Sequence, residues 1–142
     1  MMKNIIDLIG RVLISGIFIY EAVDTVLFYY ETKAKMTAFS IMWQQDVLLV
    51  SSVVILSIGG LLILLGYRVA FGGFLLLAYW IPVTFIAHSF WTYPAPEVRI
   101  EALIFAKNLA IAGGVMLLMI NGSGRFSLKR IMQVTKIPKS ET

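Results

Sequence analysis

The chain contains 142 residues, of which 59% are hydrophobic and 14% are charged. An ordinary soluble domain is roughly 45–50% apolar and 25% charged, so this composition indicates an integral membrane protein. The chain has no cysteine and one histidine, which excludes thiol-based redox chemistry, a b-type haem held by two histidines of this chain, and a thiolate or histidine-rich metal site. The net charge of +4 does not indicate nucleic-acid binding, because the basic residues sort by membrane side.

Four apolar runs are long enough to cross a bilayer core about 30 Å thick, which needs roughly 20 residues per helix. In chain order we expect these helices at about 5–27, 47–65, 69–91 and 100–120. The connections are short, and in lipid every backbone polar group must pair within its own helix. The sequence therefore predicts an all-α integral membrane four-helix bundle over residues 1–124. Residues 125–142 are expected to form a basic cytoplasmic tail that can lie as an interfacial helix on anionic lipid.

The charged residues of the first span include Arg11, Glu21 and Asp24. At 1.5 Å of rise per residue, Glu21 and Asp24 lie roughly 8 and 12 Å from the middle of the span toward the outer face of the membrane. Arg11 lies roughly 8 Å from the middle toward the cytoplasmic face. A charge in hydrocarbon costs about 2.5–3.5 kcal/mol, so such groups normally face a bundle interior or a water-filled cavity. Glu21 and Asp24 are therefore ligand-binding or proton-relay candidates. Arg11 is expected to be a structural or lipid-facing charge that snorkels to the cytoplasmic headgroups.

The second and third spans carry Gly-Gly pairs at 59–60 and 72–73. Small residues let membrane helices approach closely, so these pairs predict tight helix packing. Pro82 removes one backbone donor from the third span and is expected to kink it.

The only histidine, His88, ends the third span. Spacing predicts that Thr84, His88 and Trp91 share one helix face, with Trp91 in the aromatic belt at the membrane surface. Two interpretations of His88 stay open. It is either satisfied at the membrane surface by water or a neighbouring carboxylate, or it is a hydrogen-bond donor or proton relay at a ligand pocket shared with Glu21, Asp24 or Glu101.

The fourth span contains Glu101 and Lys107, which lie roughly 14 and 5 Å from its middle toward the outer face of the membrane. Lys107 matches Glu21 in depth, so we expect the two to pair in the bundle interior, as a structural ion pair or as part of a site. Small residues recur every four positions at Ala106, Ala110 and Gly114, which predicts a close-packed face on this helix.

The basic residues outside the spans are distributed unevenly between the two sides of the membrane. With four spans, one side holds three of them, Lys33, Lys35 and Arg99, and the side of the termini holds seven, namely Lys3, Arg68, Arg125, Lys129, Arg130, Lys136 and Lys139. Because basic loops stay in the cytoplasm, we expect both termini there.

Three segments resemble the DoxX family of small four-helix bacterial membrane proteins. They are "IGRVLISGIFIYEAVD", "IGGLLILLGYRVAFGGFLLLAYWIPVTFIAHSFW" and "EALIFAKNLAIAGGVMLL". The most specific part is the order Gly-Gly, Leu-Gly-x-Arg, His-x-Phe-Trp and Lys-Asn-Leu-Ala. The resemblance implies a location in the bacterial inner membrane. It draws attention to seven positions, namely Arg11, Glu21, His88, Trp91, Glu101, Lys107 and Asn108. The segment "YEAVDTV" is acidic where the family often has a lysine, which leaves the charge of the ligand open.

Members of this family include the membrane subunit of a thiosulfate:quinone oxidoreductase and proteins linked to oxidative-stress complexes. The resemblance thus favours a subunit or quinone-binding module of a membrane redox system. His88, Trp91 and Lys107 would line the apolar slot that holds the quinone. No cofactor is encoded in the chain, so electrons would come from a partner protein. Two alternatives are a proton-coupled transporter that uses Glu21, and a non-catalytic subunit that docks a partner protein through helix faces or the loop at 33–45.

Overall fold

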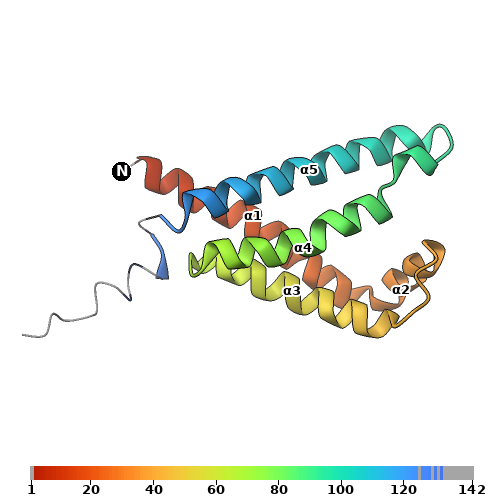
Figure 1. Cartoon of the computed structure of the whole chain (residues 1–142), viewed down its shortest axis with the longest axis horizontal. Helices are drawn as coiled ribbons and strands as arrows, with labels where there is room; N and C mark the ends of the chain where they lie inside the picture. Colours follow the sequence, from red (N-terminus) through yellow and green to blue (C-terminus); the bar gives the residue numbers. More distant parts are fainter. Residues whose placement is uncertain (1, 125, 129, 131, 133–142) are drawn as a thin grey trace, which may run out of the picture.

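The protein is helical throughout the part of the chain that the computed structural model describes, which is residues 2–124, 126–128, 130 and 132. Figure 1 shows the elements, which in chain order are α1 (Met2–Leu27), α2 (Tyr29–Ala38), α3 (Gln45–Leu65), α4 (Val69–Ala87), the short 3₁₀ helix η1 (Phe90–Thr92) and α5 (Glu97–Asn121). The expected all-α fold is confirmed. Most of the expected tail at 125–142 lies outside the described residues. Its expected interfacial helix therefore stays a prediction.

Three segments are each long and apolar enough to cross a membrane: α3, the stretch Val69–Thr92, and α5. Helices α1 and α2, over Asn4–Leu27 and Tyr29–Ala38, are bent by 93° relative to one another and meet the same length and hydropathy requirement when they are taken together as one span. The chain is therefore an integral membrane helical bundle, as the sequence predicted.

Helix α2 was not expected, because the sequence analysis treated residues 33–45 as a loop. Its sequence, YYETKAKMTA, is polar and it buries none of its residues. A segment of this kind leaves the apolar interior, and the 93° bend at Phe28 turns it away from α1. We refer below to the end of the bundle that carries α2 and the α4–α5 connection as the α2 end (Figure 1).

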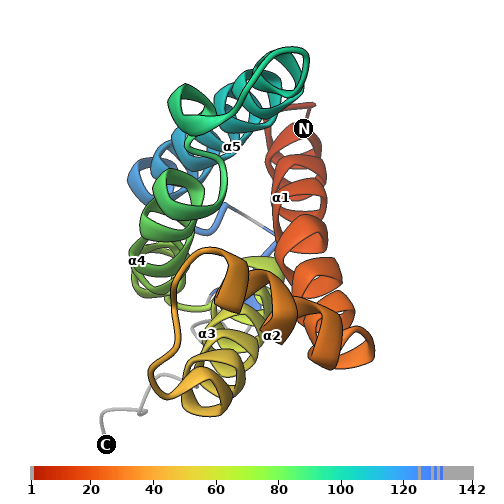
Figure 2. The ribbon, with the colours of Figure 1, turned by 90° about the vertical axis from the view of Figure 1, so that its right-hand side faces the viewer.

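The helices pack in the order α1 on α3, α3 on α4 and α4 on α5, while α1 and α5 make few contacts. The bundle is thus an open row of helices and not a closed ring. Figure 2, which looks onto the α2 end, shows the start of α5 and the α1–α2 elbow lying apart from one another. In α5 the half nearer the α2 end buries none of its residues, whereas Ala112, Val115 and Leu118 in the other half are buried.

Helices α3 and α4 approach closely where Gly59 of one Gly-Gly pair faces Gly72 of the other. A Cβ atom on Gly59 would lie 2.7 Å from Leu76 Cδ2 and 3.0 Å from the backbone oxygen of Gly72. Because only a hydrogen fits there, the glycines allow the two backbones to meet. The prediction of tight packing at these pairs is confirmed.

Every third or fourth residue of α1 is buried, as expected for one helix face turned to a core. The buried set is Arg11, Ser15, Phe18, Ala22 and Thr25. Phe18 packs edge to face on Trp80 of α4, with ring centroids 5.0 Å apart. Around them, the core is made by Leu56 and Ile63 of α3, Leu76 of α4 and Val115 of α5.

Candidate functional site

The candidate site lies at the α2 end, where α4 and α5 are joined by an ion pair. The regular helix α4 ends at Ala87, and His88 forms its C-terminal cap by donating its backbone N–H to the Thr84 oxygen at 3.1 Å. Its Nδ1 atom lies 2.8 Å from Glu101 Oε2, and the two side chains are 27% and 21% exposed. The expected association of His88 with Glu101 is thus found in the structure.

A second polar contact lies one turn deeper, beneath His88. Asn108 of α5 donates its side-chain amide to Thr84 Oγ1 at 3.2 Å, and its backbone oxygen accepts the Trp80 indole N–H at 3.1 Å. Thr84 is 1% exposed. Because each of these polar groups is paired, the interior between α4 and α5 tolerates them. This network fixes the spacing of the two helices that carry His88 and Glu101.

A cluster of aromatic side chains lies close in sequence to both members of the ion pair. Phe105, one turn after Glu101 on α5, packs against Phe85, Phe90 and Trp91, with ring centroids 5.1, 5.5 and 5.9 Å apart. Trp91 is 57% exposed and belongs to η1. The expectation that it shares a helix face with His88 and Thr84 is wrong, because α4 ends at Ala87 and the chain changes direction there.

The carboxylates of α1 approach the same region from the opposite side. Glu21 is partly buried, and the charged groups near enough to act on it are Asp24, His88 and Lys35. His88 therefore lies between a direct partner on α5 and a more distant carboxylate on α1. Asp24 is also partly buried.

Lys107 does not join this group, which corrects the expectation that it pairs with Glu21 in the interior. Its side chain is exposed, and within the described residues no ion pair links it to Glu21. The neighbouring Asn108 points inward instead, and one residue along a helix turns the side chain by about 100°. Ala106 and Ala110 are likewise exposed, so the expected close-packed face of small residues holds only at Gly114.

Of the two alternatives expected for Arg11, the structural one holds, and the lipid-facing one is wrong. Its side chain has no exposed surface, its Nε lies 3.2 Å from Asp7 Oδ2, and an Nη group donates to the backbone oxygen of Phe126. It lies against Gly66 in the turn between α3 and α4. Arg11 is thus a structural charge at the N-terminal end, far along α1 from His88.

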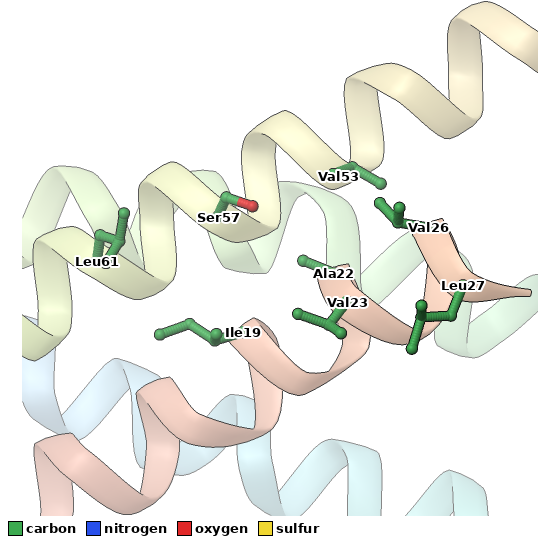
Figure 3. Close-up of a pocket in the computed structure, with 8 residues that line it drawn as sticks. All are labelled: Ile19, Ala22, Val23, Val26, Leu27, Val53, Ser57 and Leu61. Carbon is green, nitrogen blue, oxygen red and sulfur yellow. The ribbon is translucent and has the colours of Figure 1, made fainter. Parts of the chain in front are cut away.

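A hollow of the surface lies elsewhere, between α1 and α3. This groove of about 280 Å³ is open to the outside and is lined by the side chains drawn in Figure 3, which are Ile19, Ala22, Val23, Val26, Leu27, Val53, Ser57 and Leu61. No lining residue is charged, and none belongs to the ion pair or its aromatic neighbours. The groove presents methyl groups at the depth of the acyl chains and supplies no chemistry.

The arrangement at His88 can exchange protons and donate or accept a hydrogen bond. A carboxylate on Nδ1 fixes the ring and leaves Nε2 for a ligand, and among the described residues no side chain or backbone group is bonded to Nε2. No cluster of three metal-ligating side chains occurs in the same part of the chain. Phe105 and Trp80 were not predicted as site residues. For Phe105 a signal existed, because it lies four residues after Glu101 and thus on the same face of the helix.

Comparisons with known proteins agree with this picture. Inner membrane protein YqjF of Escherichia coli (strain K12) is 28% identical over 135 residues, which cover 92% of this chain and 97% of that protein. No solved structure matches the chain significantly. The sequence profile of the DoxX family matches residues 6–89, which is more than half of the chain and includes His88. The chain therefore belongs to the DoxX family.

Proposed function

We propose that this protein is the quinone-binding membrane module of a redox system in the bacterial inner membrane, with both termini in the cytoplasm. The name of its relative, inner membrane protein YqjF, supports the location. The observation that carries the proposed function is the 2.8 Å contact between His88 and Glu101 beside the cluster of Phe85, Phe90, Trp91 and Phe105. A flat apolar ring with polar oxygens needs both parts of this site.

The residues fit such a group in three respects. Aromatic rings offer faces and edges for stacking on a planar headgroup. The partly exposed imidazole, held through Nδ1, offers Nε2 to a carbonyl or hydroxyl oxygen. The position at the end of a membrane span, where the chain leaves its regular helix, is one that a lipid-soluble molecule reaches from the bilayer.

Quinone reduction consumes two electrons and two protons, and this chain's own residues can serve only the protons. His88 accepts a proton at Nε2 from a bound hydroxyl, or donates one when the ring is charged, while Glu101 stabilises the charged ring. Glu21, a partly buried carboxylate of α1, is the candidate for the next step of the proton's path. The electrons come from a partner protein, because the chain contains no thiol and encodes no redox centre.

Binding of decylubiquinone and of menadione to the purified protein in lipid nanodiscs tests this proposal. Quenching of tryptophan fluorescence measures the affinity. We expect His88→Ala and Glu101→Gln each to weaken binding about tenfold or more, since each removes a hydrogen bond that involves a charged group.

Glu97→Gln is the matched control, because Glu97 lies one turn before Glu101 on α5 and is exposed. We expect the affinity of this variant to equal that of the wild type. Circular dichroism and gel filtration verify that each variant folds. Wild-type affinity in both site variants, or an equal loss in the control, would refute the quinone site.

Proton-coupled transport through Glu21 remains the second candidate. Because Lys107 is exposed and forms no ion pair with Glu21 among the described residues, no lysine of α5 occupies the Glu21 carboxylate, which can then carry a proton. A transporter would move protons across sealed liposomes in response to a substrate gradient, and Glu21→Gln would abolish that movement while leaving quinone affinity unchanged.

A further inference from the structure

The groove between α1 and α3, which we call the α1–α3 groove, is lined by the eight residues drawn in Figure 3. It begins beside a close contact of the two helices, where a Cβ atom on Gly60 of α3 would lie 3.0 Å from Ile19 Cγ1 of α1. From this level it runs toward the α2 end, where Val53 and Leu27 line its last part (Figure 3). The rise per residue gives it a length of roughly 12 Å between Ile19 and Leu27.

The dimensions of the α1–α3 groove favour a chain-like occupant. Ala22, which lines it, is 3% exposed, whereas its neighbours Val23 and Val26 are 50% and 57% exposed. A helix is about 10 Å wide, so a 12 Å length of it fills roughly 900 Å³, far more than the 280 Å³ of the groove. A bilayer core of about 30 Å gives the acyl chains of each leaflet about 15 Å. One acyl chain therefore matches the length of the groove, and a helix of a second protein does not enter it.

Polar side chains lie beyond the end of the groove that is nearer α2. Asp46 precedes Val53 by about two turns and therefore lies on the same face of α3, nearer the α2 end. Its Oδ1 atom accepts hydrogen bonds from Tyr29 Oη at 2.5 Å and from Lys33 Nζ at 2.6 Å. Tyr29 begins α2, directly after the elbow that follows Leu27. The groove thus leads to a polar cluster made by Tyr29, Lys33 and Asp46.

The polar cluster carries both signs of charge and is neutral overall. Lys33 balances Asp46, and the other two charged residues of α2, Glu31 and Lys35, balance one another. A lysine ammonium has three donors, and in the described part of the chain Lys33 uses one of them, on Asp46. Asp46 accepts both of its hydrogen bonds on Oδ1, so Oδ2 can accept another. A neutral cluster with a free cationic donor and a free anionic acceptor complements a zwitterionic headgroup better than an anionic one.

We propose that the α1–α3 groove and the polar cluster form a specific site for phosphatidylethanolamine. One acyl chain of the lipid fills the groove, Lys33 donates to the phosphate, and the ethanolamine ammonium donates to Asp46. Because α1, α2 and α3 all contribute, the bound lipid holds the α1–α2 elbow against α3. The site shares no residue with the ion pair of His88 and Glu101, so this inference does not rest on the proposed quinone site.

Native mass spectrometry of the purified protein in detergent measures lipid binding directly. The palmitoyl-oleoyl forms of phosphatidylethanolamine, phosphatidylcholine and phosphatidylglycerol share their acyl chains and differ in the headgroup. Phosphatidylcholine has no N–H donor for Asp46, and phosphatidylglycerol has no ammonium. We therefore expect one phosphatidylethanolamine molecule to bind about tenfold more tightly than either, as for the loss of a hydrogen bond to a charged group. Equal affinity for the three lipids would overturn the proposal.

Ser57→Phe tests the groove, because Ser57 lines it and a phenyl ring there takes the space of the acyl chain. We expect the affinity for phosphatidylethanolamine to fall about tenfold or more, the size expected when a packed site is overfilled. Ser51→Phe is the matched control, since Ser51 is an exposed serine of α3 turned by about 120° from Ser57. Wild-type affinity in Ser57→Phe, or an equal loss in Ser51→Phe, would refute the site.

Photolabelling of the wild-type protein gives a test that does not depend on the folding of a variant. Phosphatidylethanolamine with a diazirine in its acyl chain, in liposomes, should label residues 19–27 and 53–61 most densely. Equally dense labelling of exposed α5 residues such as Leu103 and Leu117 would mean ordinary bilayer contact and would overturn the proposal. So would a dimer in the native spectra that Ser57→Phe dissociates and Ser51→Phe does not, because the groove would then be an interface between two copies.

Discussion

The Arg11 guanidinium lies 3.2 Å from the Asp7 carboxylate, one turn earlier on α1, and it has no solvent exposure. It also donates to the backbone of Phe126, beyond the end of α5, and lies against Gly66 between α3 and α4. One side chain thus ties three parts of the chain together at the N-terminal end. The row of helices is closed there by Arg11, whereas it is open at the α2 end.

Removing only the carboxylate should destabilise the bundle more than removing both charges. Asp7→Asn leaves a buried guanidinium without its counter-ion and should lower the free energy of unfolding by about 3 kcal/mol. The double variant Asp7→Asn with Arg11→Met replaces the charge by an apolar chain of similar length and should lose less. Equilibrium unfolding in mixed micelles measures both values. A double variant that is less stable than Asp7→Asn would show that Arg11 stabilises the fold by more than this ion pair.

The helices themselves could be predicted from the sequence, because an apolar run of about 20 residues has few alternatives. The rotation of each helix could not, and Lys107 shows the reason. Apart from a few polar residues, helix α5 carries apolar side chains on every face, so hydropathy does not distinguish its inner face. The stripe at Ala106 and Ala110 suggested a face turned by about 160° from the one through Asn108.

Two other differences have local causes. Arg11 looked isolated because the prediction considered how deep each charge lies in its span and not which side chains neighbour it on the helix. The spacing of four residues from Asp7 is, however, a sequence signal for an ion pair on a helix. Helix α2 was missed because it is short and polar and lacks a buried face. The pairing of His88 with Glu101 was among the expected alternatives, since both were placed at a similar depth.

Adding one methyl group should have opposite effects at two glycines. Gly59→Ala forces a Cβ atom against Leu76 and the Gly72 backbone at 2.7 and 3.0 Å, and we expect a loss of about 1–3 kcal/mol in the free energy of unfolding. Gly113→Ala meets nothing within 4 Å and gains up to about 1 kcal/mol from helix propensity. Unfolding of both variants in the same micelles provides the comparison. Equal effects would mean that the α3–α4 crossing is looser than described.

The orientation in the membrane is testable with single cysteines in the cysteine-free chain. If both termini are cytoplasmic, Lys35→Cys on α2 reacts with a membrane-impermeant maleimide in cells whose outer membrane alone is permeabilised. Arg68→Cys, in the turn between α3 and α4, reacts only after the inner membrane is opened. The excess of basic residues on the side of Arg68 is the physical reason. Labelling of Arg68→Cys first would reverse the topology.

Side chains of two α3 residues hold helix α2: Gln45 donates to Thr37 Oγ1 at 2.8 Å, and the Asp46 carboxylate accepts two hydrogen bonds, so Asp46 should restrict the mobility of α2 the most. Asp46 Oδ1 accepts hydrogen bonds from Lys33 Nζ at 2.6 Å and from Tyr29 Oη at 2.5 Å. Because Asp46 is exposed, these bonds add little to the stability of the bundle, yet few other contacts join α2 to its neighbours.

Asp46→Ala should therefore increase the mobility of a spin label at Glu31→Cys on α2 while leaving the unfolding midpoint unchanged. A label at Glu97→Cys, exposed at the start of α5, is the control and should keep its mobility in the same variant. Continuous-wave electron paramagnetic resonance in nanodiscs measures both labels. An unchanged spectrum at Glu31→Cys would mean that the bend at Phe28, and not Asp46, fixes the position of α2 over the end of the bundle.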